Sequence, residues 1–210
     1  MGDIETIALT MGASWASGIN LYATLLVLGY LHLTGSNTLP PDLLIVANPL
    51  VMFAAGLMYV VEFFADKIPG VDTAWDTLHT FVRIPAGALL AAGAVGDGGL
   101  AAQFAVGILG GGLASATHVT KTGTRVLINT SPEPFTNWTA SVTEDVMVVG
   151  GLWTALHNPT LFLCLLIVFL LILVWALPRL WRTLHRIFAT LGRWLGLTKS
   201  PSLPPSGSEL

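Results

Sequence analysis

The sequence predicts an all-α membrane protein, a polytopic bundle of about six transmembrane helices, some of them short or broken. Two observations predict this class. The 210-residue chain is 53% hydrophobic and only 10% charged, and its mean hydropathy is +0.73. Several uncharged runs also reach the length of a membrane helix, about 20 residues, which is needed because the bilayer offers the backbone no water. We therefore expect one transmembrane domain over residues 1–178.

The expected spans follow from the uncharged runs. Two segments, residues 84–96 and 146–157, are short. Each becomes long enough to cross only if the polar stretch before it, residues 75–83 or 138–145, belongs to the same helix; re-entrant hairpins are the alternative. Four other stretches are apolar enough to cross alone: residues 11–33, 44–61, 100–120 and 160–177.

The distribution of positive charge predicts the orientation. Six crossings place Lys67, Lys121 and Arg125 on the same side as the arginine-rich segment after residue 178. Because cytoplasmic loops are enriched in Lys and Arg, both termini are expected in the cytoplasm. Residues 179–197 combine four arginines with aromatic side chains, which predicts an amphipathic interfacial helix attracted to anionic lipid. Residues 198–210 are rich in Pro and Ser, and we expect them to be disordered.

Two pairs of segments resemble each other and predict an internal duplication. Residues 12–24 align with residues 110–122, and residues 75–87 align with residues 138–150. The predicted repeats cover about residues 11–96 and 98–178. Three crossings separate the two Gly/Ser-rich helices, which contain residues 12–24 and 110–122, so the repeats are expected to be inverted, as in many transporters. Chance similarity between apolar sequences of low diversity is the alternative.

The segment after residue 70 places four polar side chains on one helix face. Their successive spacings of four, three and four residues match the helical period. A helix lying on the membrane surface explains the same pattern. If the helix enters the bilayer, its arginine costs several kcal/mol unless it is paired or hydrated. We predict that it pairs with Glu144 or Asp145 and leaves the other carboxylate to a proton or cation. The four residues are Asp72, Asp76, His79 and Arg83.

A second polar stretch, residues 118–145, supplies further candidates. His118, Lys121 and Arg125 form a basic patch that stabilises the fold, binds lipid headgroups or receives an anionic substrate. Pro132 and Pro134 interrupt the helix, so a new helix N-terminus is expected after them. The other candidate ligands of this stretch are Asn129, Glu133, Asn137, Glu144 and Asp145.

An excess of carboxylates favours a cation or a proton. Residues 62–145 contain eight Asp and Glu residues and four Lys and Arg residues. Glu62 and Asp66, one turn apart, form an expected entrance to the path, although solvated charges at a helix end explain them equally well. A row of small residues, Gly107, Gly111 and Ser115, allows close helix contact within the chain or in a homodimer.

The two polar stretches also carry a family resemblance. The segments "EFFADKIPGVDTAWDTLHTFVRIPAGA" and "NTSPEPFTNWTASVTEDV" resemble a family of small bacterial integral membrane proteins described only as a domain of unknown function. The resemblance extends to about residue 177. It implies a location in the bacterial inner membrane, and it implies no activity.

The predicted function is transport. We expect a transporter or channel for a small solute or ion, coupled to protons or cations, with residues 66–83 and 118–145 lining the path. The alternative is a non-catalytic membrane assembly or lipid-interacting protein. We expect a homodimer in the lipid bilayer, no enzymatic activity, no cofactor, no metal site and no nucleic-acid partner.

Overall fold

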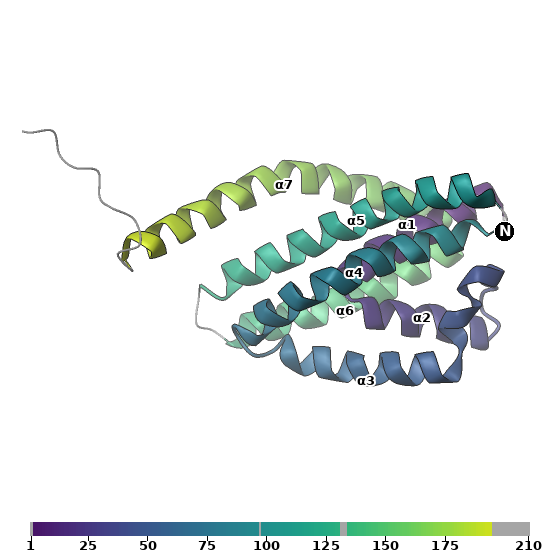
Figure 1. The fold of residues 1–210 in the computed structure, drawn as a ribbon, viewed down its shortest axis with the longest axis horizontal. Helices are drawn as coiled ribbons and strands as arrows, with labels where there is room; N and C mark the ends of the chain where they lie inside the picture. Colours follow the sequence, from purple (N-terminus) through teal and green to yellow (C-terminus); the bar gives the residue numbers. More distant parts are fainter. Residues whose placement is uncertain (1, 97, 131–133, 195–210) are drawn as a thin grey trace, which may run out of the picture.

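The computed structural model describes residues 2–96, 98–130 and 134–194. Every regular element in these ranges is helical, which confirms the all-α prediction (Figure 1). Glu133, the end of the expected interfacial helix and the expected disordered tail lie outside the described residues. The elements are α1 (Asp3–Ile19), α2 (Leu21–Leu33), a short 3-10 helix (Pro41–Ala47), α3 (Pro49–Ala65), α4 (Val71–Val95), α5 (Gly99–Ile128), α6 (Pro134–His157) and α7 (Pro159–Trp194).

Local sequence explains several helix boundaries. Pro49 and Pro159 are the first residues of α3 and α7. Proline suits this position because the first turn of a helix leaves its N–H groups without partners anyway. The Asn48 side chain accepts a hydrogen bond from Leu50 N at 2.9 Å and caps α3. Gly70, with a φ of 85°, makes the turn into α4, in a conformation that glycine adopts without strain.

The first apolar run does not form the single span expected over residues 11–33. Asn20 interrupts it with an extended backbone, at φ −145° and ψ 101°. The Asn20 side chain accepts from Ala23 N at 3.0 Å and begins a new helix, α2. Glu5, near the start of α1, and Asn37, beyond the end of α2, line the same cavity. The chain therefore reverses at Asn20, and α1 and α2 form a hairpin whose tip lies inside the bundle (Figure 1).

The two short segments do join the polar stretches before them. Both α4 and α6 are continuous helices that include these stretches, so the prediction of long helices is confirmed and the re-entrant alternative is wrong here. Asn129, at the end of α5, donates to Asp72 near the start of α4 at 2.8 Å. It also accepts from Asn137 near the start of α6 at 2.9 Å. Both helices therefore start at the same end of the bundle.

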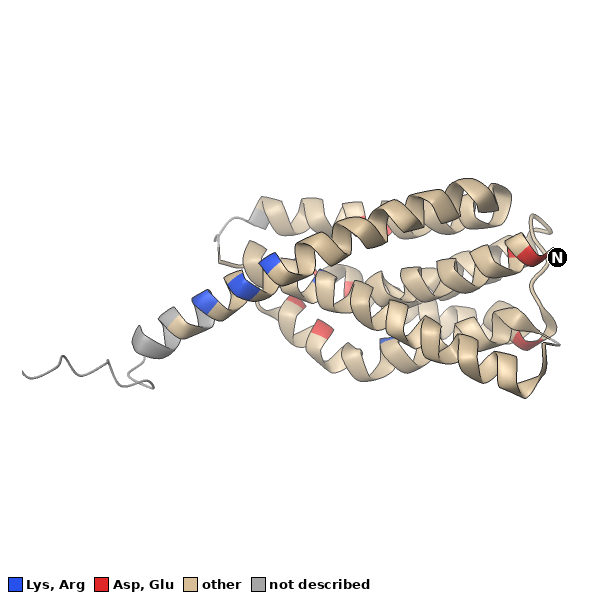
Figure 2. Cartoon of the chain, turned by 90° about the horizontal axis from the view of Figure 1, so that it is seen from above, with Lys and Arg blue, Asp and Glu red and all other residues tan. Residues whose placement is uncertain are grey.

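The two ends of the bundle differ in charge. The end with the start of α1, the loop after α2 and the α4–α5 turn has exposed Asp3, Glu5 and Asp42 and no Lys or Arg among its described residues; we call it the acidic end. The opposite end, which we call the basic end, includes Lys67 and the projecting part of α7 with exposed Arg179, Arg182 and Arg186 (Figure 2).

The start of α1 and the last described turn of α7 lie at opposite ends of the bundle (Figures 1 and 2). This arrangement does not support the expectation that both termini face the cytoplasm. The expected interfacial helix is also not a separate element, because α7 continues through Pro178 as far as Trp194. The arginine-rich segment therefore forms the last part of α7, which projects beyond the bundle.

Three described helices are long and apolar enough to cross a membrane by themselves: Val71–Val95, Gly99–Ile128 and Pro159–Arg186. The 3-10 helix and α3 meet this test together but bend by 59° where they join, and would make a fourth span. Large exposed side chains such as Phe53, Phe81 and Phe104 cover the outside, while charged side chains lie inside. The structure is that of a membrane protein with three to four apolar spans.

The related segments run in the same direction. Gly18 of α1 faces Ala114 of α5, and Ser14 faces Gly110, so residue numbers increase together along the two helices. Since α4 and α6 also start at the same end, neither related pair is antiparallel, and the expected inverted repeat is not formed. Helix α1 lies at the centre of the bundle and packs against α4, α5, α6 and α7.

Candidate functional site

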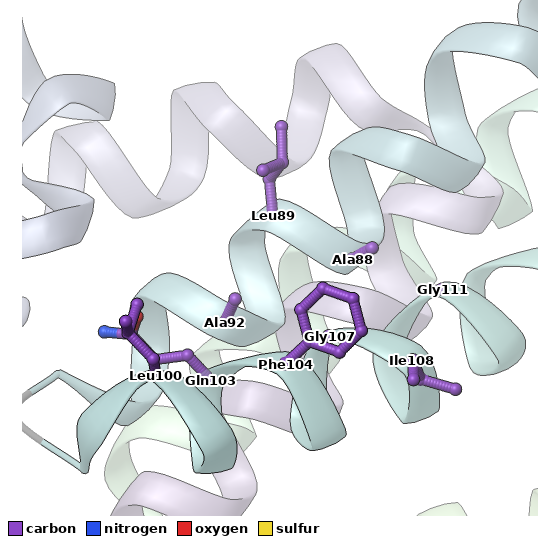
Figure 3. Close-up of a pocket in the computed structure, with 9 residues that line it drawn as sticks. All are labelled: Ala88, Leu89, Ala92, Leu100, Gln103, Phe104, Gly107, Ile108 and Gly111. Atoms are coloured by element: carbon purple, nitrogen blue, oxygen red, sulfur yellow. The ribbon is translucent and has the colours of Figure 1, made fainter.

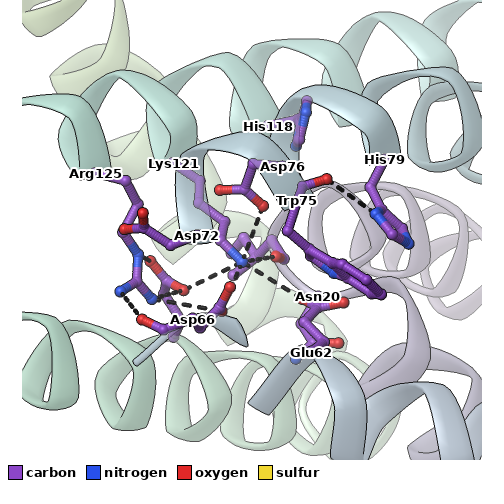
Figure 4. Close-up of polar contacts among 12 residues, drawn as sticks. Asn20, Glu62, Asp66, Asp72, Trp75, Asp76, His79, His118, Lys121 and Arg125 are labelled. Carbon is purple, nitrogen blue, oxygen red and sulfur yellow. Dashed lines mark hydrogen bonds and ion pairs between the residues drawn. The ribbon is translucent and has the colours of Figure 1, made fainter. Parts of the chain in front are cut away.

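Seven charged side chains meet in the interior, between the tip of the hairpin and the basic end (Figure 4). The Glu144 side chain is 18% exposed, and each of the other six is at most 4% exposed. We call this set the ion-pair network. Its members are Glu62 and Asp66 from the end of α3, Asp76 and Arg83 from α4, Lys121 and Arg125 from α5, and Glu144 from α6.

Arg83 is completely buried and has four partners. Its Nη2 lies 2.5 Å from Glu62 Oε1, and its Nη1 lies 3.1 Å from Asp76 Oδ1. Nη1 also donates to the Ile19 carbonyl oxygen at 3.1 Å and to His118 Nδ1 at 3.3 Å. The prediction that Arg83 pairs with Glu144 or Asp145 is therefore wrong. Its carboxylate partners come from α3 and from its own helix.

The partners of His118 determine its tautomer. Arg83 only donates hydrogen bonds, so His118 Nδ1 must be the acceptor and the ring proton lies on Nε2. Nε2 lies 2.7 Å from Thr80 Oγ1, which it reaches as a donor. Thr80 Oγ1 in turn donates to the Asp76 carbonyl oxygen at 3.1 Å. His118 is therefore neutral in this arrangement and adds no charge to the network.

Lys121 lies at the centre of the network, with its ammonium group surrounded by oxygen atoms. Nζ donates to the Ile19 carbonyl oxygen at 3.2 Å, to Glu62 Oε1 at 3.4 Å and to Asp66 Oδ2 at 3.1 Å. Asp76 Oδ1 at 3.5 Å and Glu144 Oε2 at 3.4 Å lie within ion-pair distance. An ammonium has three N–H donors, and the first three contacts use all of them.

Arg125 joins the network to α6. It binds both carboxylate oxygens of Glu144, from Nε at 3.2 Å and from Nη2 at 2.7 Å, a bidentate geometry that favours arginine over lysine. Its Nη1 donates to the carbonyl oxygens of Asp66 at 3.1 Å and Asn137 at 3.2 Å. Arg125 therefore fixes the relative positions of the end of α3, α5 and α6.

The tip of the hairpin completes the site from the other side. Because α1 ends at Ile19, the carbonyl oxygen of this residue is free to accept from both Arg83 and Lys121. Asn20 Nδ2 donates to Asp145 Oδ1 at 3.0 Å, and Tyr59 donates to Asp145 Oδ2 at 2.9 Å. The break in the helix thus frees a backbone carbonyl oxygen that an unbroken helix would pair with its own N–H groups.

The remaining predicted residues lie around the network. Asp72, Asn129 and Asn137 form a hydrogen-bonded group toward the basic end. His79 stacks on Trp75 and lies 3.0 Å from the Tyr22 hydroxyl. All four residues of the predicted stripe on α4 are buried, which excludes the surface helix: Asp72, Asp76, His79 and Arg83.

Glu62 and Asp66 do not form an entrance. Glu62 is completely buried and Asp66 is 3% exposed, so they belong to the interior of the site and not to its mouth. Asn20, Tyr59 and Thr80 also contribute to the site, although they were not among the predicted residues. Only Asn20 had a visible signal, because it is an isolated amide in a long apolar run. No group of three or more His, Cys, Asp or Glu side chains in the described part of the chain is arranged to hold a metal ion.

A lateral groove of about 460 Å³ lies apart from the network, between α4 and α5 (Figure 3). Ala88, Ala92, Gly107 and Gly111 line it with small side chains, and Gln103 is its one polar lining residue among those described. Within the chain, Gly107 and Gly111 face Ala88, so the predicted row of small residues brings α4 and α5 together. The groove lacks charged groups among its described lining residues and does not belong to the ion-pair network.

The comparison with known proteins assigns a family. The family model described as "Domain of unknown function (DUF4126)" matches residues 7–179. No curated protein and no solved structure matches the chain. The matched range includes all of the α1–α2 hairpin except the first four residues of α1, and every member of the ion-pair network. The chain therefore belongs to the family described as a domain of unknown function, DUF4126.

Proposed function

We propose that the protein is a small membrane transporter or channel for a cation or a proton, and that the ion-pair network is its binding site. One observation carries the proposal: seven charged groups converge inside an apolar bundle, at the point where the α1–α2 hairpin breaks. Charged side chains at membrane depth are costly, and in membrane proteins they commonly mark ion or proton pathways.

The broken hairpin supports this function. In many transporters the substrate or coupling ion is bound by helices that are interrupted near the middle of the membrane. The C-terminal end of α1 carries the partial negative charge of the helix dipole and offers the Ile19 carbonyl oxygen to two cationic side chains. The same end favours a bound cation. Asn20 then begins α2 and leads the chain back toward the acidic end.

The charges of the network also favour a cation over an anion. Four carboxylates, of Glu62, Asp66, Asp76 and Glu144, face only three cationic side chains. Asp72 and Asp145 lie close by and add further negative charge. An anionic substrate would meet net repulsion in this interior.

The orientation of the bundle forms part of the proposal. Helices α3 to α7 cross the inner membrane five times, and the α1–α2 hairpin enters from the outside without crossing. The positive-inside rule places the basic end in the cytoplasm. The start of α1 then faces the outside, and Arg179, Arg182 and Arg186 lie near anionic lipid headgroups on the inside.

Thiol labelling in spheroplasts tests this orientation. With Cys164 replaced by alanine to remove the exposed native thiol, S36C is expected to react with a membrane-impermeant maleimide in intact spheroplasts. R182C is expected to react only after lysis, because the cytoplasm shields it. Equal access to both positions from the same side would contradict five crossings and restore an even number of spans.

Flux through proteoliposomes tests the function itself. E144Q is expected to lower proton or alkali-cation flux by about ten- to hundred-fold, because a hydrogen bond to a charged group is worth about 1.5–3 kcal/mol. D42N, which removes an exposed carboxylate outside the network, is the matched control and should keep full flux. Both variants should elute as folded protein. Wild-type vesicles that move no protons, sodium or potassium would rule out the function and favour the role in membrane assembly.

A further inference from the structure

The ion-pair network has one positive charge too few. Arg83, Lys121 and Arg125 carry three positive charges, and the hydrogen bonds of His118 leave this residue neutral. Fully ionised, the four carboxylates give the network a net charge of −1. A buried net charge costs several kcal/mol and is normally neutralised by a proton or a counter-ion. Counted over its own seven members, the network therefore lacks one positive charge.

The hydrogen bonds identify Asp76 as the carboxylate without a donor. Glu62 has Arg83, Glu144 has Arg125 in a bidentate pair, and Asp66 has Lys121. The three N–H groups of Lys121 are used elsewhere, and Arg83 Nη1 directs its hydrogens to Ile19 and His118. Within the described residues, no donor reaches either oxygen of Asp76, although this side chain is completely buried.

The buried polar atoms of the network that lack a hydrogen-bond partner include more acceptors than donors. In the described part of the network they are four acceptor oxygens, Glu62 Oε2, Asp66 Oδ1 and both Asp76 oxygens, against a single donor, Arg83 Nε. Asp72 and Asp145 do not share this deficit, because amide or hydroxyl groups donate to each of them. The missing charge thus coincides with a missing hydrogen-bond donor. A proton on a carboxyl group supplies both at once.

We propose that the network binds a single proton per chain, shared by its carboxylates, with Asp76 as the carboxylate whose oxygens have no hydrogen-bond donor in the described part of the chain. The inference rests on the proposed transport function, because it names the ion that the site binds. A proton fits better than a metal ion, since no described group of three acidic or histidine side chains is arranged to coordinate one. Among the described residues, the charged or titratable groups that face Asp76 are the other six members of the network and His118: Glu62 and Asp66 from α3, Arg83 from α4, His118, Lys121 and Arg125 from α5, and Glu144 from α6.

The coupled groups titrate together, so the bound proton belongs to the network and not to one residue. Removing any one carboxylate makes the network neutral without a proton. Removing one cationic side chain leaves the network with a net charge of −2, so two protons are needed to neutralise it. These two classes of variant therefore change proton occupancy in opposite directions, which a purely structural cluster would not do.

Infrared spectroscopy of the full chain in nanodiscs tests the proposal. The wild type at neutral pH is expected to show the carbonyl stretch of one protonated carboxyl group, shifted in heavy water. D76N should lose this band and K121M should double it, while D42N, the matched control outside the network, should keep it. E144Q repeats the test at the least buried carboxylate if D76N does not fold.

Three results would overturn the proposal: no such band in the wild type, a band that survives in both D76N and E144Q, or a band that appears only when choline replaces sodium and potassium. The last result would identify an alkali cation as the bound charge. The infrared band and the ion flux test two different claims, the bound proton and the transport function. Flux without the band contradicts the proton but keeps the transport function, and the band without flux does the reverse.

Discussion

Replacing Arg83 with methionine is expected to lower the free energy of unfolding by about 3–5 kcal/mol, because it leaves buried carboxylates without a partner. Methionine keeps much of the side-chain volume, so the loss is one of charge and hydrogen bonds. Glu62 loses its closest cation, and Asp76 loses its own nearest positive charge. The measurement is reversible unfolding in mixed micelles followed by tryptophan fluorescence.

A second substitution separates charge from packing in this experiment. R83M combined with E62Q removes both partners of the shortest ion pair, and it should recover a large part of the lost stability, since no unpaired carboxylate remains at that position. R182M, on the exposed face of α7, is the matched control and should stay within about 0.5 kcal/mol of the wild type. If R83M and R182M unfold alike, the ion-pair network does not stabilise the fold.

The stability and the proposed function depend on the same groups. Lys121 reaches oxygens from the α1 terminus, α3, α4 and α6, so any movement of these helices changes its surroundings. The proposed proton does not require such a movement, because no hydrogen-bond donor among the described residues occupies either oxygen of Asp76. The bidentate pair of Arg125 with Glu144 includes the most exposed carboxylate of the network.

The sequence predicted the elements better than their arrangement. The spacing of Asp72, Asp76, His79 and Arg83 identified the buried face of α4, because helical periodicity is a local property. The lengths of α4 and α6 followed from the requirement that short apolar segments recruit the polar stretches before them. Both inferences used only residues within one helix.

The sequence could not predict the contacts between helices. An isolated Asn20 is tolerated in a continuous span, so its role as a helix break depends on the donors and acceptors that surround it. The partner of Arg83 was sought in α6 from the alignment of the repeats, whereas the fold brings Glu62 of α3 to it. The error in the direction of the repeats has the same origin. A hairpin in place of one span reverses the direction of every later helix relative to α1.

A close contact between α1 and α5 at Gly18 predicts the second large effect. At Gly18, α1 approaches α5 so closely that an added Cβ would lie within the van der Waals radii of Thr117 Oγ1 and the Ala114 carbonyl oxygen. The hydroxyl belongs to a side chain that can rotate, but the carbonyl belongs to the backbone of α5. Small residues at such contacts allow membrane helices to pack without a hydrophobic driving force. The contact also fixes the position of Ile19, the next residue.

The variant G18A is therefore expected to lose about 3 kcal/mol of unfolding free energy, at the upper end of the cost of overpacking. The expectation depends on backbone that has to move, and G112A tests this directly. Gly112 lies in α5 with open space around its Cβ position, so alanine there should be neutral or add about 0.5–1 kcal/mol through its higher helix propensity. Unfolding in mixed micelles measures both variants. If G18A is as stable as G112A, the two helices lie further apart than this contact requires, and the Ile19 carbonyl oxygen is not held where Arg83 and Lys121 reach it.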